Sequence, residues 1–181
     1  YHFIYWKVGN HMSTLSVDTI QGQTTAANVF ITGHVIQHKI HHIRQTTEWA
    51  PGTAGTYIDL NGSSFSFTPK QSGSKLLITM INHFYCEESG TDWNAGTSRL
   101  VVDGNGQPHN GSDGLHYNVG IRDTGNSNSV RLMAYDSQEH EYTTTGTSAI
   151  TIKCQGYKMS GANIYINKYG QGSVRVLEIA Q

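Results

Sequence analysis

The sequence is short of charge, and it has no long hydrophobic run. Charged residues make up 14% of the chain, against the roughly 25% that is usual for soluble domains. A formal net charge of -1 gives no electrostatic basis for holding nucleic acid or an anionic membrane. No apolar window approaches the roughly 18 residues of a membrane-spanning helix. We therefore expect neither a nucleic-acid partner nor membrane insertion.

Cysteine is also scarce, and so are the residues that favour helices. Cys86 and Cys154 are too few for a disulfide framework. Both fall at inward positions of expected strands, which favours buried free thiols over the alternative of a single bridge between them. No cofactor is indicated by any motif.

Turn-forming and polar residues are abundant instead, with 20 glycines among 181 residues. This composition favours short strands joined by polar turns, in a chain long enough for one core. The pattern predicts about ten strands and an all-β fold, an antiparallel β-sandwich of jelly-roll type. The expected strands cover residues 33–44, 55–60, 63–68, 75–86, 97–103, 115–121, 129–135, 147–157, 162–168 and 173–180.

Turn signals separate these strands. Asn61-Gly62 predicts a type I′ turn that makes 55–60 and 63–68 a hairpin. Asp103-Gly104, followed by Asn105-Gly106, predicts a turn after residues 97–103. Residues 87–96 and 136–145 are rich in polar residues and are expected to be loops.

The stretch at 75–86 is the most apolar of the chain. One face carries Leu76, Ile78, Met80, Phe84 and Cys86, and the other carries Leu77, Thr79, Ile81, His83 and Tyr85. A strand that is largely apolar on both faces lies inside a sandwich or beneath a partner subunit. We expect it to be the central strand.

The N-terminal residues divide into two segments. The His11-Met12 pair is typical of a cloning junction, so we interpret residues 1–12 as an expression-tag scar; the alternative is native sequence added to an edge strand. Residues 13–33 carry too few apolar residues for a core of their own, which favours a stalk segment that winds around copies of itself. Residues 34–181 are the expected β-sandwich head.

Several segments share one resemblance. They are GHVIQ at 33–37, TYIDLNGSSFSFTPKQSGSKLLI at 56–78, SAITIKCQ at 148–155, IYINKY at 164–169 and SVRVLEIAQ at 173–181. Together they resemble the C-terminal part of bacteriophage tail-fibre proteins, especially those of marine and cyanobacterial phages. Residues 87–114 and 136–145 depart from that pattern, so no binding residue carries over.

The resemblance implies a homotrimeric fibre tip on a virion, made in the host cytoplasm and joined to an upstream tail-fibre shaft. Its β-sandwich head would recognise a bacterial surface glycan or an outer-membrane protein. A central strand that is apolar on both faces agrees with three-fold packing. The alternatives are a structural trimerisation or connector module and a carbohydrate-cleaving domain.

Histidines gather in residues 33–44. In a strand His34, His38 and His42 share a face, whereas in a helix they form a stripe with His41; the flanking glycine and threonines favour the strand. Three-fold symmetry would triple any histidine near the axis and could hold a transition metal. Because no Cys, Asp or Glu is near, we favour polar packing and expect no metal.

Receptor contacts are expected in two polar loops. Asp92, Trp93 and Asn94 combine an aromatic face for the apolar side of a sugar with polar groups for its hydroxyls. A second loop adds five candidates, which are His109, Asn110, Asp113, His116 and Tyr117. The alternative is that Trp93 caps one end of the sandwich or packs at a subunit interface.

No catalytic motif is present, so we expect no enzyme. The sequence has no GxSxG, HExxH or P-loop pattern. Carboxylates that could act in glycoside cleavage occur at Glu87-Glu88, Asp92, Asp113, Glu139 and Glu141. Acidic residues in polar loops are, in most proteins, simply solvated.

Overall fold

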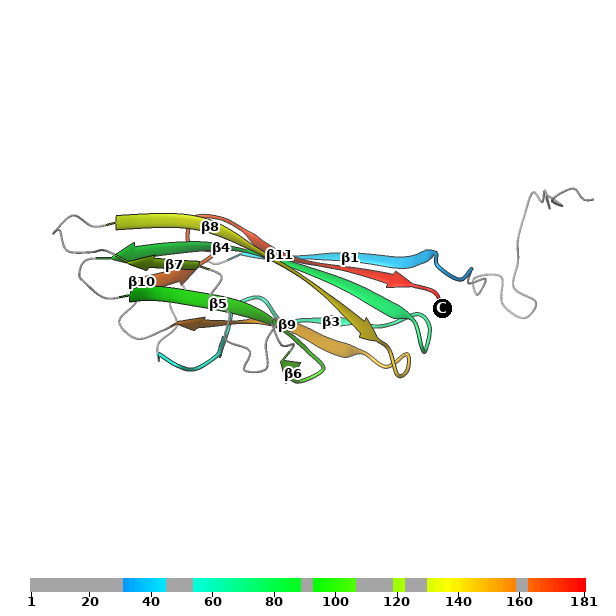
Figure 1. Cartoon of the computed structure of the whole chain (residues 1–181). Helices are drawn as coiled ribbons and strands as arrows, with labels where there is room; N and C mark the ends of the chain where they lie inside the picture. Colours follow the sequence, from blue (N-terminus) through cyan, green and yellow to red (C-terminus); the bar gives the residue numbers. More distant parts are fainter. Residues whose placement is uncertain (1–30, 45–53, 89–92, 107–118, 123–129, 159–162) are drawn as a thin grey trace, which may run out of the picture. The chain divides into compact units, whose positions relative to one another are not determined.

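Two antiparallel β-sheets pack face to face in the computed structural model of the chain (Figure 1). The structure describes residues 31–44, 54–88, 93–106, 119–122, 130–158 and 163–181. This part of the chain contains no helix, and so none that is long and apolar enough to cross a membrane. The prediction of an all-β fold with two antiparallel sheets is confirmed.

The first sheet is built around one long strand. Its strands are β1 (Val35–Ile43), β4 (Lys75–Glu88), β8 (Val130–Thr143), β10 (Asn163–Ile166) and β11 (Gly172–Ile179). β8 pairs with one edge of β4 along its whole length. On the other edge β11 pairs with the first half of β4 and β10 with the second half, and β1 pairs with β11. The prediction that residues 75–86 form the central strand is confirmed.

The second sheet contains six strands within the described residues. They are β2 (Ile58–Asp59), β3 (Phe65–Phe67), β5 (Trp93–Val102), β6 (Asn105–Gly106), β7 (Val119–Arg122) and β9 (Ile150–Lys158). β9 and β5 form its centre, with β2 and β3 on the free edge of β9 and with β6 and β7 on the free edge of β5.

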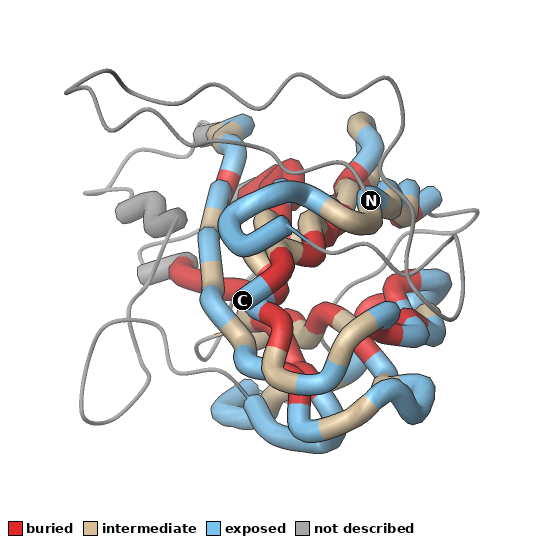
Figure 2. The backbone as a smooth tube through the Cα atoms, turned by 90° about the vertical axis from the view of Figure 1, so that its right-hand side faces the viewer, coloured by how far each residue is buried: buried red, intermediate tan, exposed pale blue. Residues whose placement is uncertain are grey.

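The core lies between the sheets and consists of aliphatic and aromatic side chains. Figure 2 marks the buried residues along the backbone in red. Leu76, Ile78, Met80 and Phe84 of β4 are fully buried there, as the alternation predicts. The side chains of Cys86 and Cys154 are also buried, and both are free thiols, which confirms the prediction. Burial raises the pKa of the Cys86 thiol to about 11, so it is protonated and unreactive at neutral pH.

Of two predicted turns, the structure confirms the one at Asp103-Gly104 and contradicts the type I′ turn at Asn61-Gly62. Asp103 and Gly104 have φ values of 50° and 80°, as a type I′ turn between β5 and β6 requires. At Asn61-Gly62 the prediction is wrong, because only Gly62 has a positive φ, of 70°. The Ser63 N–H donates to the Leu60 carbonyl (3.1 Å). β2 and β3 do not form a hairpin; each pairs with β9 instead.

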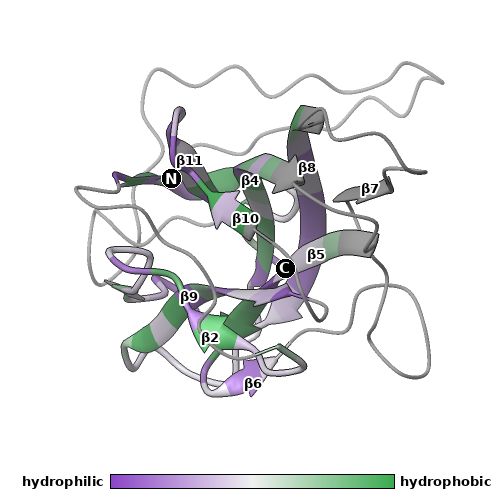
Figure 3. Cartoon of the chain, turned by 90° about the vertical axis from the view of Figure 1, so that its left-hand side faces the viewer, coloured by the Kyte–Doolittle hydropathy of each residue, from purple (hydrophilic) through white to green (hydrophobic). Residues whose placement is uncertain are grey.

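The prediction that residues 87–96 and 136–145 are loops is wrong in part, because strands include some of these residues. Residues 136–143 belong to β8, and each of them lies opposite a residue of the long β4 in an antiparallel ladder. Asp136 is buried, whereas Ser137, Glu139 and Glu141 are exposed, so this polar stretch alternates as a half-buried strand does. Figure 3 shows the resulting contrast between the mainly hydrophilic β8 and the hydrophobic β4. Residues 93–96 likewise open β5 rather than ending a loop.

The edge of the sandwich between β1 and β3 is closed by one aromatic side chain. The Phe65 ring stacks on the His41 imidazole at 4.6 Å between centroids. The Lys39 ammonium lies 5.2 Å from the centre of the same ring and donates to the Ser66 carbonyl (2.7 Å). His41 also hydrogen-bonds the Gly62 carbonyl (2.8 Å). These contacts join the first sheet to the second.

A buried carboxylate ties the loop after β3 to the end of the chain. Glu178 has no exposed surface. Its side chain accepts hydrogen bonds from the Lys70 N–H (2.9 Å), the Gln71 N–H (3.1 Å) and the Ser74 hydroxyl (2.7 Å). These donors replace the water that a carboxylate requires, so the loop is held to β11.

Replacing Glu178 by alanine will therefore lower the free energy of unfolding by about 3 kcal/mol or more, because two backbone N–H groups and a hydroxyl lose their acceptor. Chemical denaturation measures this loss. Glu141→Ala is the control, since its ion pair with Lys75 is exposed and is worth at most about 1 kcal/mol. Equal losses in the two variants would contradict this interpretation of the loop.

Candidate functional site

The predicted receptor contacts fall mostly outside the described residues. Asp92 and the whole second set, which is His109, Asn110, Asp113, His116 and Tyr117, lie there. The backbones of Trp93 and Asn94 begin β5 opposite Arg122 and Ile121 of β7, and their side chains are not described. The expectation that these residues contact a receptor stays a prediction.

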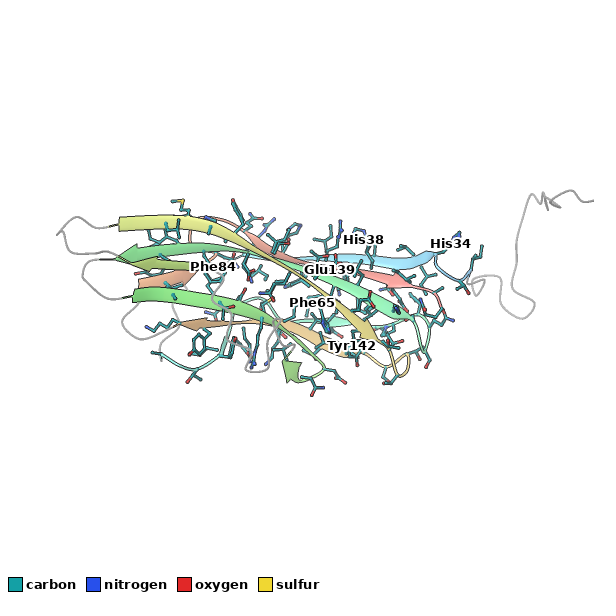
Figure 4. All side chains as sticks on the ribbon, in the orientation of Figure 1. His34, His38, Phe65, Phe84, Glu139 and Tyr142 are labelled. Atoms are coloured by element: carbon teal, nitrogen blue, oxygen red, sulfur yellow. The ribbon has the colours of Figure 1, made fainter. Side chains whose placement is uncertain are left out.

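The structure describes the histidines in and next to β1. Residues 35–43 form a strand, as predicted. His34 and His38 (Figure 4) and His42 are all exposed. His38 and His42 are four residues apart, about 13 Å along a strand, whereas ligands of one zinc ion lie about 2 Å from it. No group of three metal-ligating side chains occurs among the residues that the structure describes. Ligation across copies of the chain stays a hypothesis.

An aromatic cluster that the sequence did not reveal lies on the outer face of the first sheet. The register places Tyr85 of β4 between Tyr165 of β10 and Met133 of β8, and it places His83 opposite Tyr135. Lys168 and Tyr169 follow β10 directly. We call the seven residues His83, Tyr85, Met133, Tyr135, Tyr165, Lys168 and Tyr169 the tyrosine patch.

A turn at Asn167 forms this patch. Asn167 has a φ of 61°, a conformation that asparagine adopts more readily than most residues. Its N–H donates to the His83 carbonyl (2.6 Å), and its side-chain oxygen accepts from the His83 N–H (2.8 Å). Its amide also donates to Asn82 (3.0 Å). The end of β10 is thus fixed to β4 at the point where the chain continues into Lys168 and Tyr169.

Gly172 allows this packing of amides. A Cβ atom added at Gly172 would lie 2.5 Å from the Asn167 amide nitrogen and 2.6 Å from the Asn82 side-chain oxygen. A side chain at this position would displace the two amides that fix the end of β10 to β4, so glycine preserves the turn where the chain returns into β11.

Three tyrosine rings surround one ammonium group. The Lys168 nitrogen lies 3.9 Å from the centre of the Tyr165 ring, 5.1 Å from that of Tyr169 and 5.3 Å from that of Tyr85. The Tyr85 and Tyr169 rings meet edge to face with centroids 4.9 Å apart. Cation–π and edge-to-face contacts stabilise this arrangement, which positions Tyr169 before any ligand arrives.

The patch has a buried floor and an exposed rim. His83 and Tyr85 are each 4% exposed, whereas Tyr135 is 73% and Tyr169 61% exposed. The Tyr135 ring rests on the His83 imidazole, with centroids 5.0 Å apart. Exposed rings supported by buried ones offer an apolar surface whose hydroxyls can still hydrogen-bond, and such clusters mark interaction sites.

His83 is neutral in this environment. Burial lowers the pKa of its imidazole below the usual 6.5 because it disfavours the charged form. Its Nδ1 atom is buried and has no hydrogen-bond partner among the described residues. A Cβ on Gly170 would lie 3.1 Å from the ring, so the backbone of the β10–β11 loop packs directly on His83.

Apart from the tyrosine patch, a cluster of polar side chains lies inside the sandwich. The Ser98 hydroxyl donates to Asp136 (2.6 Å), as does the Gln138 amide (2.7 Å), and the Asn82 amide donates to Ser98 (3.1 Å). Ser98 has no exposed surface and Asp136 only 5%. A substrate has no access to these groups, so we interpret them as links between the sheets.

Comparisons of this chain with protein-family models and with curated proteins find no match.

Acidification will test the buried state of His83. The unfolded chain takes up a proton near pH 6.5, whereas folded His83 does so only at lower pH, so its contribution to stability is lost as the pH falls below 6.5. The difference in free energy of unfolding between the parent and His83→Asn will therefore be smaller at about pH 5.5 than at about pH 7.5. An equal difference at both pH values, measured by urea denaturation, would show that His83 is not held neutral.

Proposed function

We propose that this protein is the receptor-binding tip of a phage tail fibre, which attaches a virion to a glycan on the bacterial surface without cleaving it. The tyrosine patch is the observation that supports glycan binding. The exposed rings of Tyr135 and Tyr169 can lie against the apolar C–H face of a sugar, while their hydroxyls bond its hydroxyl groups. Because Tyr169 is already positioned by Lys168 and Tyr85, binding loses little side-chain freedom.

The wider assembly is part of the proposal. It comprises a homotrimer, a jelly-roll-like head, a stalk in residues 13–33 and an upstream fibre shaft. The tag assignment of residues 1–12 stays an expectation. Each site can be weak, because linked copies on one fibre and several fibres on one virion raise avidity by about 10²-fold or more. An outer-membrane protein is the alternative receptor on the same surface.

Tyr135→Ala and Tyr169→Ala will each weaken attachment of the fluorescently labelled protein to a susceptible bacterial strain, and the double variant will weaken it on the order of 100-fold. The expected loss is on the order of 10-fold for each ring, about 1.4 kcal/mol. Val35→Ala is the control, because Val35 is exposed and apolar but lies on β1, outside the patch. Melting temperatures close to that of the parent will show that the variants fold.

The panel of strains also separates the alternative functions. Strain-selective labelling with no sugar released into the supernatant is expected. Released sugar would favour the carbohydrate-cleaving domain. Labelling of no strain in a broad panel would favour the connector module.

Trp93→Ala tests the site expected from the sequence. If the polar loops bind the receptor, this variant will lose attachment while keeping its melting temperature, and the tyrosine variants will not. A large drop in melting temperature would instead indicate that Trp93 caps the sandwich. Comparing Trp93→Ala with the tyrosine variants on the same strain identifies which surface binds.

A further inference from the structure

Along the other half of β4, the outer face of the first sheet carries a short, mainly apolar stripe that no described residue covers. Leu77 and Thr79 of β4 are half-buried there, and Ile81 is 38% exposed. We call these three residues the β4 stripe. On β1, two strands away, Ile40 is 48% exposed. An apolar stripe along the central strand of a sheet is a surface for a partner.

Opposite charges flank the stripe. The register places Arg175 of β11 on one side of Thr79 and Glu139 of β8 on the other. Both are exposed, and neither forms an ion pair within the described part of the chain. Two strand spacings, about 9.5 Å, separate their backbones. The two charges are therefore available to a second molecule.

Symmetry determines which charges would meet. If two copies faced each other about an axis perpendicular to the strands, Arg175 would face Arg175 and Glu139 would face Glu139. About an axis parallel to β4, the β11 side of one copy faces the β8 side of the next. Arg175 then meets Glu139, and the β4 stripes of the copies pack together at the axis. Charge complementarity and apolar contact agree only for this second arrangement.

We propose that copies of this chain associate through the β4 stripe about an axis parallel to β4, with Arg175 of each copy facing Glu139 of its neighbour. This deepens the proposed homotrimer, on which it rests for the number of copies. The axis lies along the strands, so each copy contributes one basic and one acidic flank to a closed ring.

The tyrosine patch does not share this interface. β8 crosses β4 midway, lying above it at the left of Figure 1 and below it at the right. Because the two strands are paired throughout, this crossing is a strong twist of the sheet. The outer face at Tyr85 and the outer face at Leu77 therefore point in different directions, and association at the β4 stripe leaves the patch open.

Charge reversal tests the interface by sedimentation velocity. Arg175→Glu and Glu139→Arg will each weaken association on the order of 100-fold, because like charges then face each other. The double variant Arg175→Glu Glu139→Arg will associate as the parent does, since every pair is again opposite. Lys70→Glu is the control for net charge, because Lys70 is exposed on the loop after β3.

Restored association in the double variant supports the proposal and also shows that the single variants can fold. A monomeric parent, or single variants that associate as well as the parent, would overturn it. Cell attachment is measured on the same samples. A monomeric parent that still labels cells overturns this interface and leaves the proposed attachment standing. A parent that associates but labels no strain supports this interface and overturns the proposed attachment.

Discussion

The unbroken antiparallel register between β4 and β8 is the constraint on which the rest of the structure depends. It runs from the Lys75–Thr143 pair to the Glu88–Val130 pair. The same register sets Tyr135 on His83 and Glu139 beside Thr79. A slip of one residue would turn every side chain of β8 to the opposite face, which would bury Glu139 and expose Asp136. Both proposed surfaces therefore depend on one ladder of hydrogen bonds.

The sequence predicts those parts of the fold in which apolar residues alternate. The two faces of β4, the strand at 35–43, the presence of a turn at Asp103-Gly104 and the buried thiols follow from local pattern. The course of residues 136–143 does not, because polar composition there indicates a loop. Pairing with β4 overrides that preference, as tertiary contacts often do. The intervening residues Asp136, Gln138 and His140 are polar too, so the sequence shows no apolar alternation that would indicate a strand.

The tyrosine patch could not be predicted from the sequence for a different reason. Its residues come from three strands and a turn, and their meeting depends on the left-handed conformation of Asn167, which a single sequence does not reveal. Only the face shared by His83 and Tyr85 was visible beforehand. The loops that the sequence predicts as receptor contacts, around Trp93 and His109, combine aromatic and polar residues in adjacent positions. Sequence reasoning finds such local combinations more readily than it finds a surface assembled across strands.

The pairing of β1 with β11 has a mechanical consequence. Hydrogen bonds from the Gly33 N–H to the Ala180 carbonyl (2.8 Å) and from the Ala180 N–H to the His34 carbonyl (3.0 Å) fix the start of β1 beside the end of β11. The tyrosine patch lies at the opposite end of β4, near Tyr85. Tension applied between Gly33 and the patch would run along the strands and strain the β1–β11 hydrogen bonds together in shear. A sheet pulled in this direction resists separation far better than one whose hydrogen bonds break one after another.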